Sequence, residues 1–250
     1  MTYSVKADTL KDRIILITGA SDGIGKQAAI SYAQHGATVI LTGRSMMKLE
    51  DTARKIHDAC DPQASVITLD MMKATRQDYL SLAKVIESEY GRLDGLLHSA
   101  GQLGDICPFE SIEEQVYDEV MQVNVKAQFL LTQALLPLLK QSEDSRLIFT
   151  SSTVGHEGRA HWGTYAVSKF ATEGMMQVLA DELKETKVRV NAINPGGTRT
   201  GMRAKAFPQE NPGTLKTPLD IIPLYLYLMA PEGIEVHGQC IDAQKRKPAS

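Results

Sequence analysis

Short apolar runs with the length of buried strands alternate with helix-length segments along almost the whole chain. This order constrains the fold more than any other feature, because consecutive parallel strands need a crossover helix between them. We predict strands at residues 13–18, 37–42, 65–69, 93–98, 146–150, 188–193 and 237–242. We predict helices at residues 25–35, 45–60, 76–90, 112–141 and 164–186. The pattern therefore indicates an α/β fold, a parallel sheet sandwiched between helices.

Composition narrows the class further. The 250 residues carry 27 Lys and Arg against 30 Asp and Glu, a net charge of -3, which offers no basic footprint for nucleic acid. No apolar run is long enough to span a membrane, and residues 1–12 lack the apolar core of a secretory signal. Three distant cysteines, Cys60, Cys107 and Cys240, have no metal-ligand spacing, so we expect no metal and a reducing cytoplasm. With no linker, we expect one domain over residues 1–250, with a core from about 12 to 242.

A glycine-rich turn, Thr18-Gly-Ala-Ser-Asp-Gly-Ile-Gly25, lies between the first predicted strand and the first predicted helix. Glycines there let the backbone come close to a pyrophosphate, which the amide groups and dipole of the helix start can hold. An ordinary glycine turn is the alternative interpretation. The context of strand before and helix after favours a dinucleotide site.

Tyr165 and Lys169 stand one helical turn apart at the start of a predicted helix, so their side chains leave the same face. A fixed ammonium nearby favours phenolate and draws the pKa of the phenol toward neutrality. The two residues are therefore a candidate proton relay. The alternative is that they are two ordinary positions of an amphipathic helix.

The spacing TGxxxGxG together with Tyr165-Ala-Val-Ser-Lys169 resembles the short-chain dehydrogenase/reductase family over about residues 12–242. Residues 121–125, 170–176 and 194–200 are similar to one subgroup of uncharacterised oxidoreductases within it. The resemblance implies one Rossmann domain with a seven-stranded sheet in the order 3-2-1-4-5-6-7 and a site beyond the carboxyl ends of the strands. It also implies a homo-oligomer, a dimer or a tetramer.

The same resemblance implies a catalytic set. Tyr165 would exchange the proton, and Lys169 would lower the pKa of Tyr165 and bond the nicotinamide ribose. Ser152, 13 residues before Tyr165, would stabilise the substrate oxygen rather than attack it, with Ser151 as the alternative. Asn124 would hold a relay water, or else be a structural polar residue.

The resemblance also implies the cofactor contacts. These are Gly19, Ser21, Gly23, Ile24, Gly25, Arg44, Asp70, Ala100, Gly101, Tyr165, Lys169, Pro195, Gly196, Thr198 and Thr200. Asp70 could bond the adenine amino group or cap the next helix. His98 and Ser99 stand where the family usually has two asparagines, so we leave them out of the site.

Gly43 and Arg44 follow the second predicted strand, where a Rossmann fold meets the adenosine ribose. A carboxylate that would select NAD is absent there, and the guanidinium can bind a 2'-phosphate. Asp22 favours NAD instead, because NADP-preferring members often carry a basic residue at its place. We therefore expect NADP, with NAD as the second choice.

We expect an enzyme that reduces a ketone, aldehyde or 3-oxoacyl group to an alcohol with NADP(H). The alternative is a regulator or scaffold that binds NADP(H) without catalysis. Residues 201–218 have the composition of a lid, or of a plain surface loop. The pocket walls would be His161, Trp162, Met202, Ala206 and Phe207, with arginines 159, 199 and 203 at the mouth; the polar tail at residues 245–247 has no assigned role.

Overall fold

A seven-stranded parallel sheet forms the centre of the computed structural model, which describes residues 3, 5–60 and 64–245. The strand order is β3-β2-β1-β4-β5-β6-β7, as the resemblance implied. The strands are β1 (Ile14–Thr18), β2 (Thr38–Gly43), β3 (Ala64–Thr68), β4 (Gly95–His98), β5 (Ser145–Thr150), β6 (Val188–Asn194) and β7 (Cys240–Asp242). All six neighbouring pairs are parallel, so every carboxyl end lies at one edge of the sheet.

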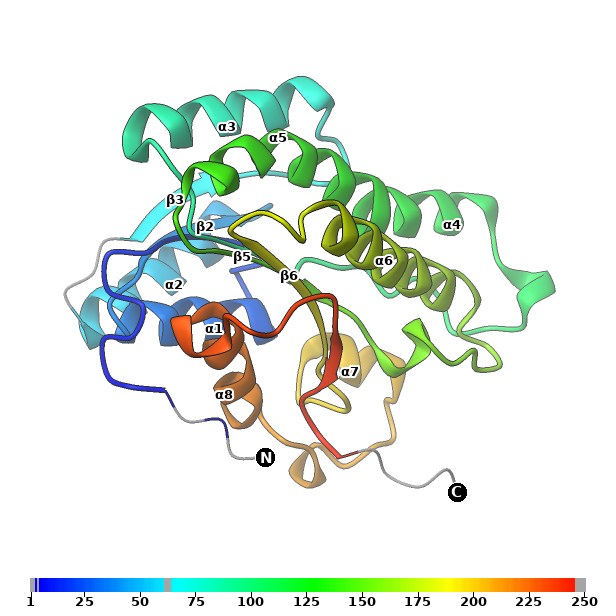
Figure 1. Cartoon of the computed structure of the whole chain (residues 1–250). Helices are drawn as coiled ribbons and strands as arrows, with labels where there is room; N and C mark the ends of the chain where they lie inside the picture. The colour runs from blue at the N-terminus through cyan, green and yellow to red at the C-terminus, as the bar shows by residue number, and fades with distance from the viewer. Residues whose placement is uncertain (1–2, 4, 61–63, 246–250) are drawn as a thin grey trace.

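Helices cover both faces of the sheet, which gives the expected three layers (Figure 1). One face carries α1 (Gly23–Gln34), α2 (Met46–Ala59) and α8 (Pro218–Met229). The other carries α3 (Arg76–Tyr90), α5 (Ala127–Gln141) and α6 (Gly163–Glu182). Each face has its own buried apolar cluster, because the strands of a parallel sheet present apolar side chains on both sides.

The long helix predicted at residues 112–141 is interrupted by a π-helical turn. The segment consists of α4 (Glu114–Met121), a turn of π-helix (Gln122–Lys126) and α5. Asn124 sits in the middle of the π turn and is completely buried. Such turns shift the carbonyls of the surrounding helix and often mark functional positions.

Two helices near the C-terminal part of the sequence were not predicted. The shorter, α7 (Gly201–Ala206), and a 3-10 turn (Pro212–Thr214) lie within the expected lid. The longer, α8, is apolar on almost every side and contains Pro223, so neither its periodicity nor its composition indicated a helix. Its start has a capping box between Thr217 and Asp220.

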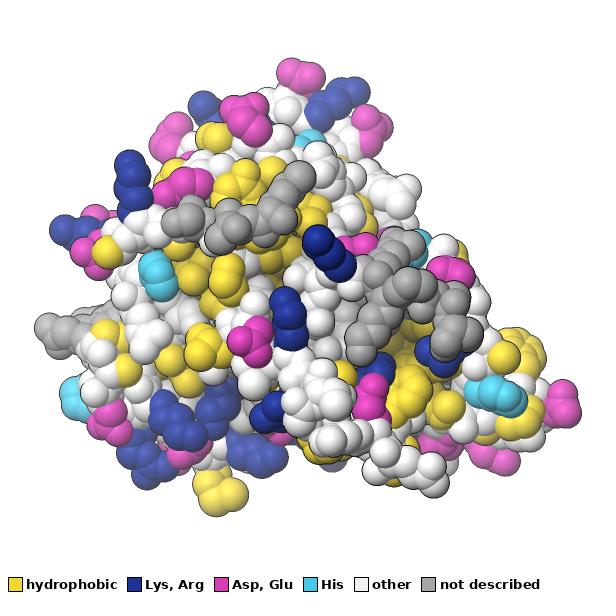
Figure 2. Space-filling view, turned by 90° about the horizontal axis from the view of Figure 1, so that it is seen from below, with side chains coloured by type: hydrophobic (Ala, Val, Ile, Leu, Met, Phe, Trp, Pro, Cys, Tyr) yellow, Lys and Arg dark blue, Asp and Glu magenta, His cyan; other side chains and the backbone are white. Residues whose placement is uncertain are grey.

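The two described ends of the chain lie on the lower side of the molecule in Figure 1, and Figure 2 looks onto that side. Near one end, the ring of Tyr3 packs against the ring of Tyr227 in the last turn of α8.

Lysine and arginine side chains gather toward the lower left of the face in Figure 2, with acidic side chains among the rest of the surface. Of the tail at residues 245–247, residues 246 and 247 lie outside the described part of the chain. Among the described helices, none has the length and apolar character needed to cross a membrane.

Candidate active site

A cleft of about 1110 Å³ runs along the carboxyl edge of the sheet, across the point where β1 and β4 lie side by side. This is the switch point at which doubly wound sheets bind their ligands. Thr18 helps to shape it, since its hydroxyl accepts hydrogen bonds from the backbone N–H groups of Ser99 (3.0 Å) and Ala100 (3.1 Å). All the predicted site residues except Gly25 and Asn124 line the cleft: Gly19, Ser21, Gly23, Ile24, Arg44, Asp70, Ala100, Gly101, Ser152, Tyr165, Lys169, Pro195, Gly196, Thr198 and Thr200.

The glycine turn needs glycine for two different reasons. Gly19 and Gly23 have φ of +67° and +54°, a conformation that other residues rarely adopt. A Cβ on Gly25 would lie 2.5 Å from the carbonyl oxygen of Gly19. Gly25 therefore lets α1 pack closely against the turn and does not itself face the cleft.

Asp22, which favoured NAD in the sequence, is engaged within its own turn. Its carboxylate accepts a hydrogen bond from the backbone N–H of Gly23 at 2.7 Å and caps α1. A residue that serves as an N-cap has a structural reason to be acidic. The presence of Asp22 thus carries less information about the cofactor than the sequence alone suggested.

The end of the cleft near β2 carries exposed positive charge. Arg44 follows Gly43 at the strand end, and Ser45 and Lys48 line the same part of the cleft. Lys48 was missed by sequence reasoning, although it lies one turn beyond Arg44 on a helix start that faces the cleft. Asp70, on the neighbouring wall, accepts a hydrogen bond from the backbone N–H of Met72 at 3.1 Å, so it shapes its own turn and also lines the cleft.

The opposite end of the cleft carries the predicted catalytic set. Tyr165 and Lys169 leave the first turns of α6, and Ser152 follows β5 directly across from them. The Lys169 ammonium donates a hydrogen bond to the carbonyl oxygen of Thr150 at 2.8 Å and lies 5.5 Å from the centre of the Tyr165 ring. The Tyr165 hydroxyl contacts the sulfur of Met202 at 3.8 Å. Ser151, the alternative to Ser152, instead donates to the carboxylate of Glu173 at 2.5 Å.

Burial dominates the acid-base properties of this end. It raises the pKa of Tyr165 to about 12, while a hydrogen bond with Ser152 acts in the lowering direction. Burial also lowers the pKa of Lys169 to about 8, against the raising effect of the Glu173 charge. We expected Lys169 to bring the pKa of Tyr165 down, but this pKa is raised in the structure, because desolvation of the phenolate is the largest influence on it.

Asn124 lies behind the cleft wall and joins three segments. Its side chain accepts from the backbone N–H of Gln102 (2.7 Å) and donates to the carbonyl of Gln102 (2.8 Å) and to the hydroxyl of Ser168 (3.0 Å). Its own carbonyl accepts from Thr172 at 3.5 Å. The amide therefore ties the loop after β4 to α6, which is a structural role that does not exclude the predicted relay.

His98 and Ser99, the departure from the family pattern, have separate environments. His98 is fully buried, stacks on Phe149 at 4.8 Å and hydrogen-bonds Thr132 at 2.8 Å. Burial, helped by the Lys169 charge, lowers the pKa of His98 to about 3, so its ring is neutral. Ser99 lines the cleft. His98 thus fills the core behind the site, and Ser99 supplies the small wall.

The loop after β6 is held by residues that the sequence did not single out. Gln244 donates to the carbonyl oxygens of Pro195 (2.7 Å) and Gly197 (3.1 Å). Asn194 donates to the carboxylate of Asp242 at 2.7 Å. Thr198 is buried and its hydroxyl donates to the carbonyl of Pro195, whereas Thr200 caps α7. No local motif marks Gln244, because its partners lie almost 50 residues away in the sequence.

The side of the cleft formed by Trp162 and the segment 201–218 is mainly apolar and aromatic. Trp162, Met202 and Ala206 line it, and the ring of Phe207 lies 5.7 Å from that of Trp162. Neither the exposed His161 nor Phe207 is in the lining, so their expected place in the wall was wrong.

The three arginines that were expected at the mouth are engaged in different ways. The Arg203 guanidinium makes two hydrogen bonds to Glu210, at 2.6 and 2.7 Å, and lies 3.8 Å from the centre of the Phe207 ring. Arg199 donates to the carbonyls of Pro212 and Leu215 and so holds the two ends of the segment 199–215 together. Arg159 lies 5.8 Å from the Phe207 ring. The positive charge expected here is thus partly neutralised or used for structure.

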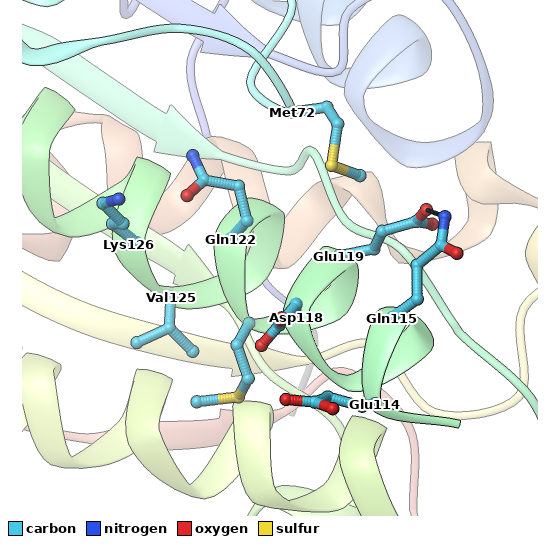
Figure 3. Close-up of a pocket in the computed structure, with 9 residues that line it drawn as sticks. Met72, Glu114, Gln115, Asp118, Glu119, Gln122, Val125 and Lys126 are labelled. Carbon is cyan, nitrogen blue, oxygen red and sulfur yellow. Dashed lines mark hydrogen bonds between the residues drawn. The ribbon is translucent and has the colours of Figure 1, made fainter. Parts of the chain in front are cut away.

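A second hollow lies beside the cleft, along α4 (Figure 3). It shares Met72 and Glu119 with the cleft and is lined also by Glu114, Asp118 and Gln122. Figure 3 shows the carboxylates on the surface of α4, with Gln115 bonded to Glu119. Carboxylates in this arrangement repel phosphate groups. The longer cleft, with its glycine turn and basic end, is therefore the better dinucleotide site.

Comparison with known proteins agrees with this geometry. Residues 13–211 match the family model described as short chain dehydrogenase, and the chain belongs to this family. It is 57% identical to the uncharacterized oxidoreductase YciK of Escherichia coli K12 over 99% of this chain and 98% of that protein, which confirms the subgroup. It is 30% identical to the 3-oxoacyl-[acyl-carrier-protein] reductase FabG of Thermotoga maritima over 93% of this chain and 96% of that protein.

Among solved structures, a short-chain dehydrogenase from Shigella flexneri 2a complexed with NADP is similar to this chain with a TM-score of 0.94. It is 57% identical, and the match covers 96% of this chain and 100% of that one. The chain is therefore a short-chain oxidoreductase by family.

Proposed function

We propose that this enzyme uses NADP(H) to reduce a carbonyl compound to an alcohol. The observation that carries the proposal is the convergence of Ser152, Tyr165 and Lys169 on one end of a cleft whose other end has the glycine turn and a basic wall. A regulator that only binds the cofactor needs the glycine turn, but it has no need of a phenol and an ammonium at the far end. The proposed unit is a single domain over residues 1–250 that contains both the cofactor and the catalytic residues.

The residues at the β2 end fit NADP. A side chain at position 43 would crowd the cleft, because its Cβ would lie 3.3 Å from the Ser21 hydroxyl, so Gly43 keeps this space open. Arg44 and Lys48 line the same wall. A guanidinium and an ammonium both favour a 2'-phosphate, and the guanidinium can donate two parallel hydrogen bonds to it. Asp22 also lines the cleft, but its hydrogen bond from the N–H of Gly23 gives it a structural reason to be acidic, and Arg44 and Lys48 are two basic groups against one acidic group. The NADP complex of the Shigella flexneri relative supports the same choice.

The chemistry follows from the charge that develops on the substrate oxygen. Reduced nicotinamide, when bound, supplies the hydride that the carbonyl carbon accepts. Tyr165 gives its hydroxyl proton to the carbonyl oxygen, while Ser152 donates a hydrogen bond to the same oxygen and stabilises its negative charge. Lys169, held by the carbonyl of Thr150, places a positive charge near the phenolate that remains. The phenolate is then reprotonated from solvent, and oxidation of an alcohol uses the same residues in reverse.

The lid favours an apolar substrate of moderate size. Trp162, Met202 and Ala206 offer apolar surface, and Glu210 neutralises Arg203. A small anionic keto acid calls for an unpaired arginine in the pocket. We therefore propose a ketone, an aldehyde or a 3-oxoacyl group; the similarity to a 3-oxoacyl reductase supports the last of these without selecting it.

We also propose a cytoplasmic homo-oligomer, a dimer or a tetramer. Phe129 on α5, and Phe170 and Val178 on α6, are exposed apolar side chains on the two long helices. A second copy of the chain could cover this surface. The cytoplasmic location is proposed from the three widely spaced cysteines.

Stopped-flow fluorescence of bound NADPH tests the function. The protein is mixed with 3-oxoacyl thioesters, aromatic ketones and short keto acids, and the nicotinamide signal is followed. We expect NADPH oxidation with the apolar carbonyls. Saturable NADPH binding with no oxidation by any carbonyl would support the regulator, and turnover confined to the keto acids would overturn the argument from the apolar lid.

A further inference from the structure

Glu173 is a buried carboxylate one helical turn beyond Lys169 on α6 and only 7% exposed. It is outside the lining of the cleft and has no part in the mechanism described above. A charged group is costly to bury unless it is hydrogen-bonded or paired. Its position directly behind the catalytic set therefore calls for a physical explanation.

One oxygen of Glu173 collects hydrogen bonds from three segments. Oε1 accepts from the hydroxyl of Ser151 (2.5 Å) and the thiol of Cys240 (3.3 Å), and lies 3.1 Å from Nδ1 of His156. Ser151 follows β5, His156 follows the 3-10 turn Thr153–Gly155, and Cys240 begins β7. These contacts satisfy Oε1 of Glu173, so the cluster of His156, Glu173 and Cys240 needs no ion to hold it together.

We propose, on the basis of the function proposed above, that Glu173 is a positioning residue for proton transfer. It holds Ser151 so that the neighbouring Ser152 faces the cleft, and its negative charge stabilises the ammonium of Lys169. Glu173 acts through these two residues and does not itself touch the substrate or the cofactor.

The packing explains the first role. Ser151 and Ser152 are adjacent and both line the cleft, so the hydrogen bond that turns the Ser151 hydroxyl toward Glu173 also restricts the direction of Ser152. The space is tight, because a Cβ on Gly155 would lie 2.5 Å from the Ser151 hydroxyl and 2.7 Å from Glu173 Oε1. The contact between Ser151 and Glu173 therefore has little freedom to rearrange.

Electrostatics explains the second role. Burial lowers the pKa of Lys169 to about 8, and the Glu173 charge is the influence that raises it. His98 at the end of β4 interacts with the Lys169 charge, while His156 after the 3-10 turn Thr153–Gly155 and Cys240 on β7 face Glu173, and Asp242 lies near Cys240. His98 is neutral, and burial together with Glu173 raises the pKa of Cys240 to about 12, so that its thiol is also neutral. The Glu173 charge, one helical turn from Lys169, is therefore the influence that favours the ammonium form of Lys169.

Two variants separate the two roles. Glu173→Gln keeps an oxygen that can accept from Ser151 but removes the charge, and Ser151→Ala keeps the charge but removes the hydrogen bond. Glu182→Gln is the matched control, since Glu182 is exposed on the last turn of the same helix. For each protein, kcat, KM and NADPH affinity are measured from pH 6 to pH 10 in the presence of a chelator, and the melting temperature is recorded.

With Glu173→Gln we expect the alkaline fall of kcat to begin about one pH unit lower than in the native enzyme, since an opposite charge nearby is lost. With Ser151→Ala we expect kcat to fall about tenfold, as one buried hydrogen bond is removed, with the alkaline limb unmoved. Glu182→Gln should behave as the native enzyme. A Glu173→Gln enzyme with the native kcat and the native pH profile would overturn the proposal. A loss of kcat in the control Glu182→Gln as large as that in the Glu173→Gln or Ser151→Ala variant would overturn it as well.

Failure of the proposed function gives a different result. If the native protein binds NADPH but reduces no carbonyl, the proposed carbonyl reduction is refuted. The role of Glu173 is then tested by the pH dependence of NADPH binding alone. The loss of NADPH affinity at alkaline pH should then begin about one unit lower in Glu173→Gln, because Lys169 loses its charge earlier. An unchanged binding profile would overturn the role of Glu173. If Glu173→Gln does not fold, Gly155→Ala serves instead, because it displaces the same carboxylate by steric contact and should lower kcat as Ser151→Ala does.

Discussion

The two ends of the cleft hold their charged groups in opposite environments. At the catalytic end, Tyr165 is 8% exposed and Lys169 is 3% exposed, whereas Arg44 and Lys48 at the other end are open to solvent. Burial shifts the pKa of Tyr165 up and that of Lys169 down. The comparison teaches that the catalytic end keeps its proton-transfer groups out of water, at a cost in stability, and the exposed end obtains selectivity from charges that cost little to place.

The largest effect is expected at the buried end, from Tyr165→Phe. Loss of the hydroxyl removes the proton donor, and we expect kcat to fall by about 10²- to 10⁴-fold, with NADPH affinity within about twofold of the native value. Steady-state kinetics and a fluorescence titration measure the two quantities. Tyr117→Phe, a change at an exposed tyrosine on α4, serves as the control. Native activity in Tyr165→Phe would remove Tyr165 from the mechanism.

At the exposed end, Arg44→Asp should change affinity and leave chemistry intact. Replacing a guanidinium with a carboxylate should weaken NADPH binding by about 10- to 100-fold, the range of one to two charge-assisted hydrogen bonds. NADH binding should stay the same or improve. Both cofactors are titrated into the variant, the native protein and Arg76→Asp, which makes the same charge change at an exposed arginine on α3. Tighter binding of NADH than NADPH by the native protein would contradict the assignment.

The cost of burial can be measured as stability with Lys169→Met. The pKa of Lys169 in the folded protein is about 8, below its ordinary 10.5, so the unfolded chain binds more protons between these values. Lys169 therefore destabilises the fold below pH 8, and this penalty disappears as the pH rises through that window. We expect Lys169→Met to raise the free energy of unfolding by about 2 kcal/mol at pH 7, after the lost hydrogen bond is subtracted, and by less at pH 9.

Chemical unfolding at the two pH values measures this difference, with Lys187→Met at an exposed lysine as the control. The range stays below pH 10, because Tyr165, with its raised pKa, loses its stabilising contribution above that value. A Lys169→Met variant less stable than the native protein at pH 7 would show that burying the Lys169 charge does not destabilise the fold. The same increase in the free energy of unfolding at both pH values would show this too.

The smallest effect is expected at the lid, which has properties of both ends. Arg203 and Glu210 are each about one quarter exposed, so their ion pair should contribute less than about 1 kcal/mol. Glu210→Gln leaves Arg203 with an unpaired charge, and we expect KM to change by about two- to fivefold, upward for apolar carbonyls and downward for keto acids. Glu185→Gln is the exposed control. The same change in KM for apolar carbonyls and keto acids would show that the charge of Arg203 does not select the substrate.

Local backbone rules explain what could be predicted from the sequence. The glycines of the turn, the spacing of Tyr165 and Lys169 and the alternation of strands and helices all depend on near neighbours, and they predicted a parallel sheet between helices. The sheet order and most of the cleft lining came from the family resemblance that these motifs carry. Features that depend on distant partners could not be predicted. Gln244 is such a feature, because its partners lie almost 50 residues away. The cap that Asp22 forms with the adjacent Gly23 is local and was missed, although capping rules could have found it.

Two other differences have distinct causes. Helix α8 was missed because it is apolar almost all round, and periodicity can identify only a helix with two unlike faces. The pKa of Tyr165 was predicted with the wrong sign because the sequence shows which charge is near but gives no measure of how much water is excluded.

The fastening of the loop after β6 by Gln244 has a consequence for the order in which the protein is made. The glycine turn is translated early, and the chain can pair β1 with β2 before the later strands exist. Cys240, which bonds Glu173, and Gln244, which bonds Pro195 and Gly197, are translated after every residue that lines the cleft. We therefore expect a nascent chain arrested before residue 240 to have the glycine turn in place and an unfinished catalytic end, so that the enzyme cannot act until residues 240–244 have been made.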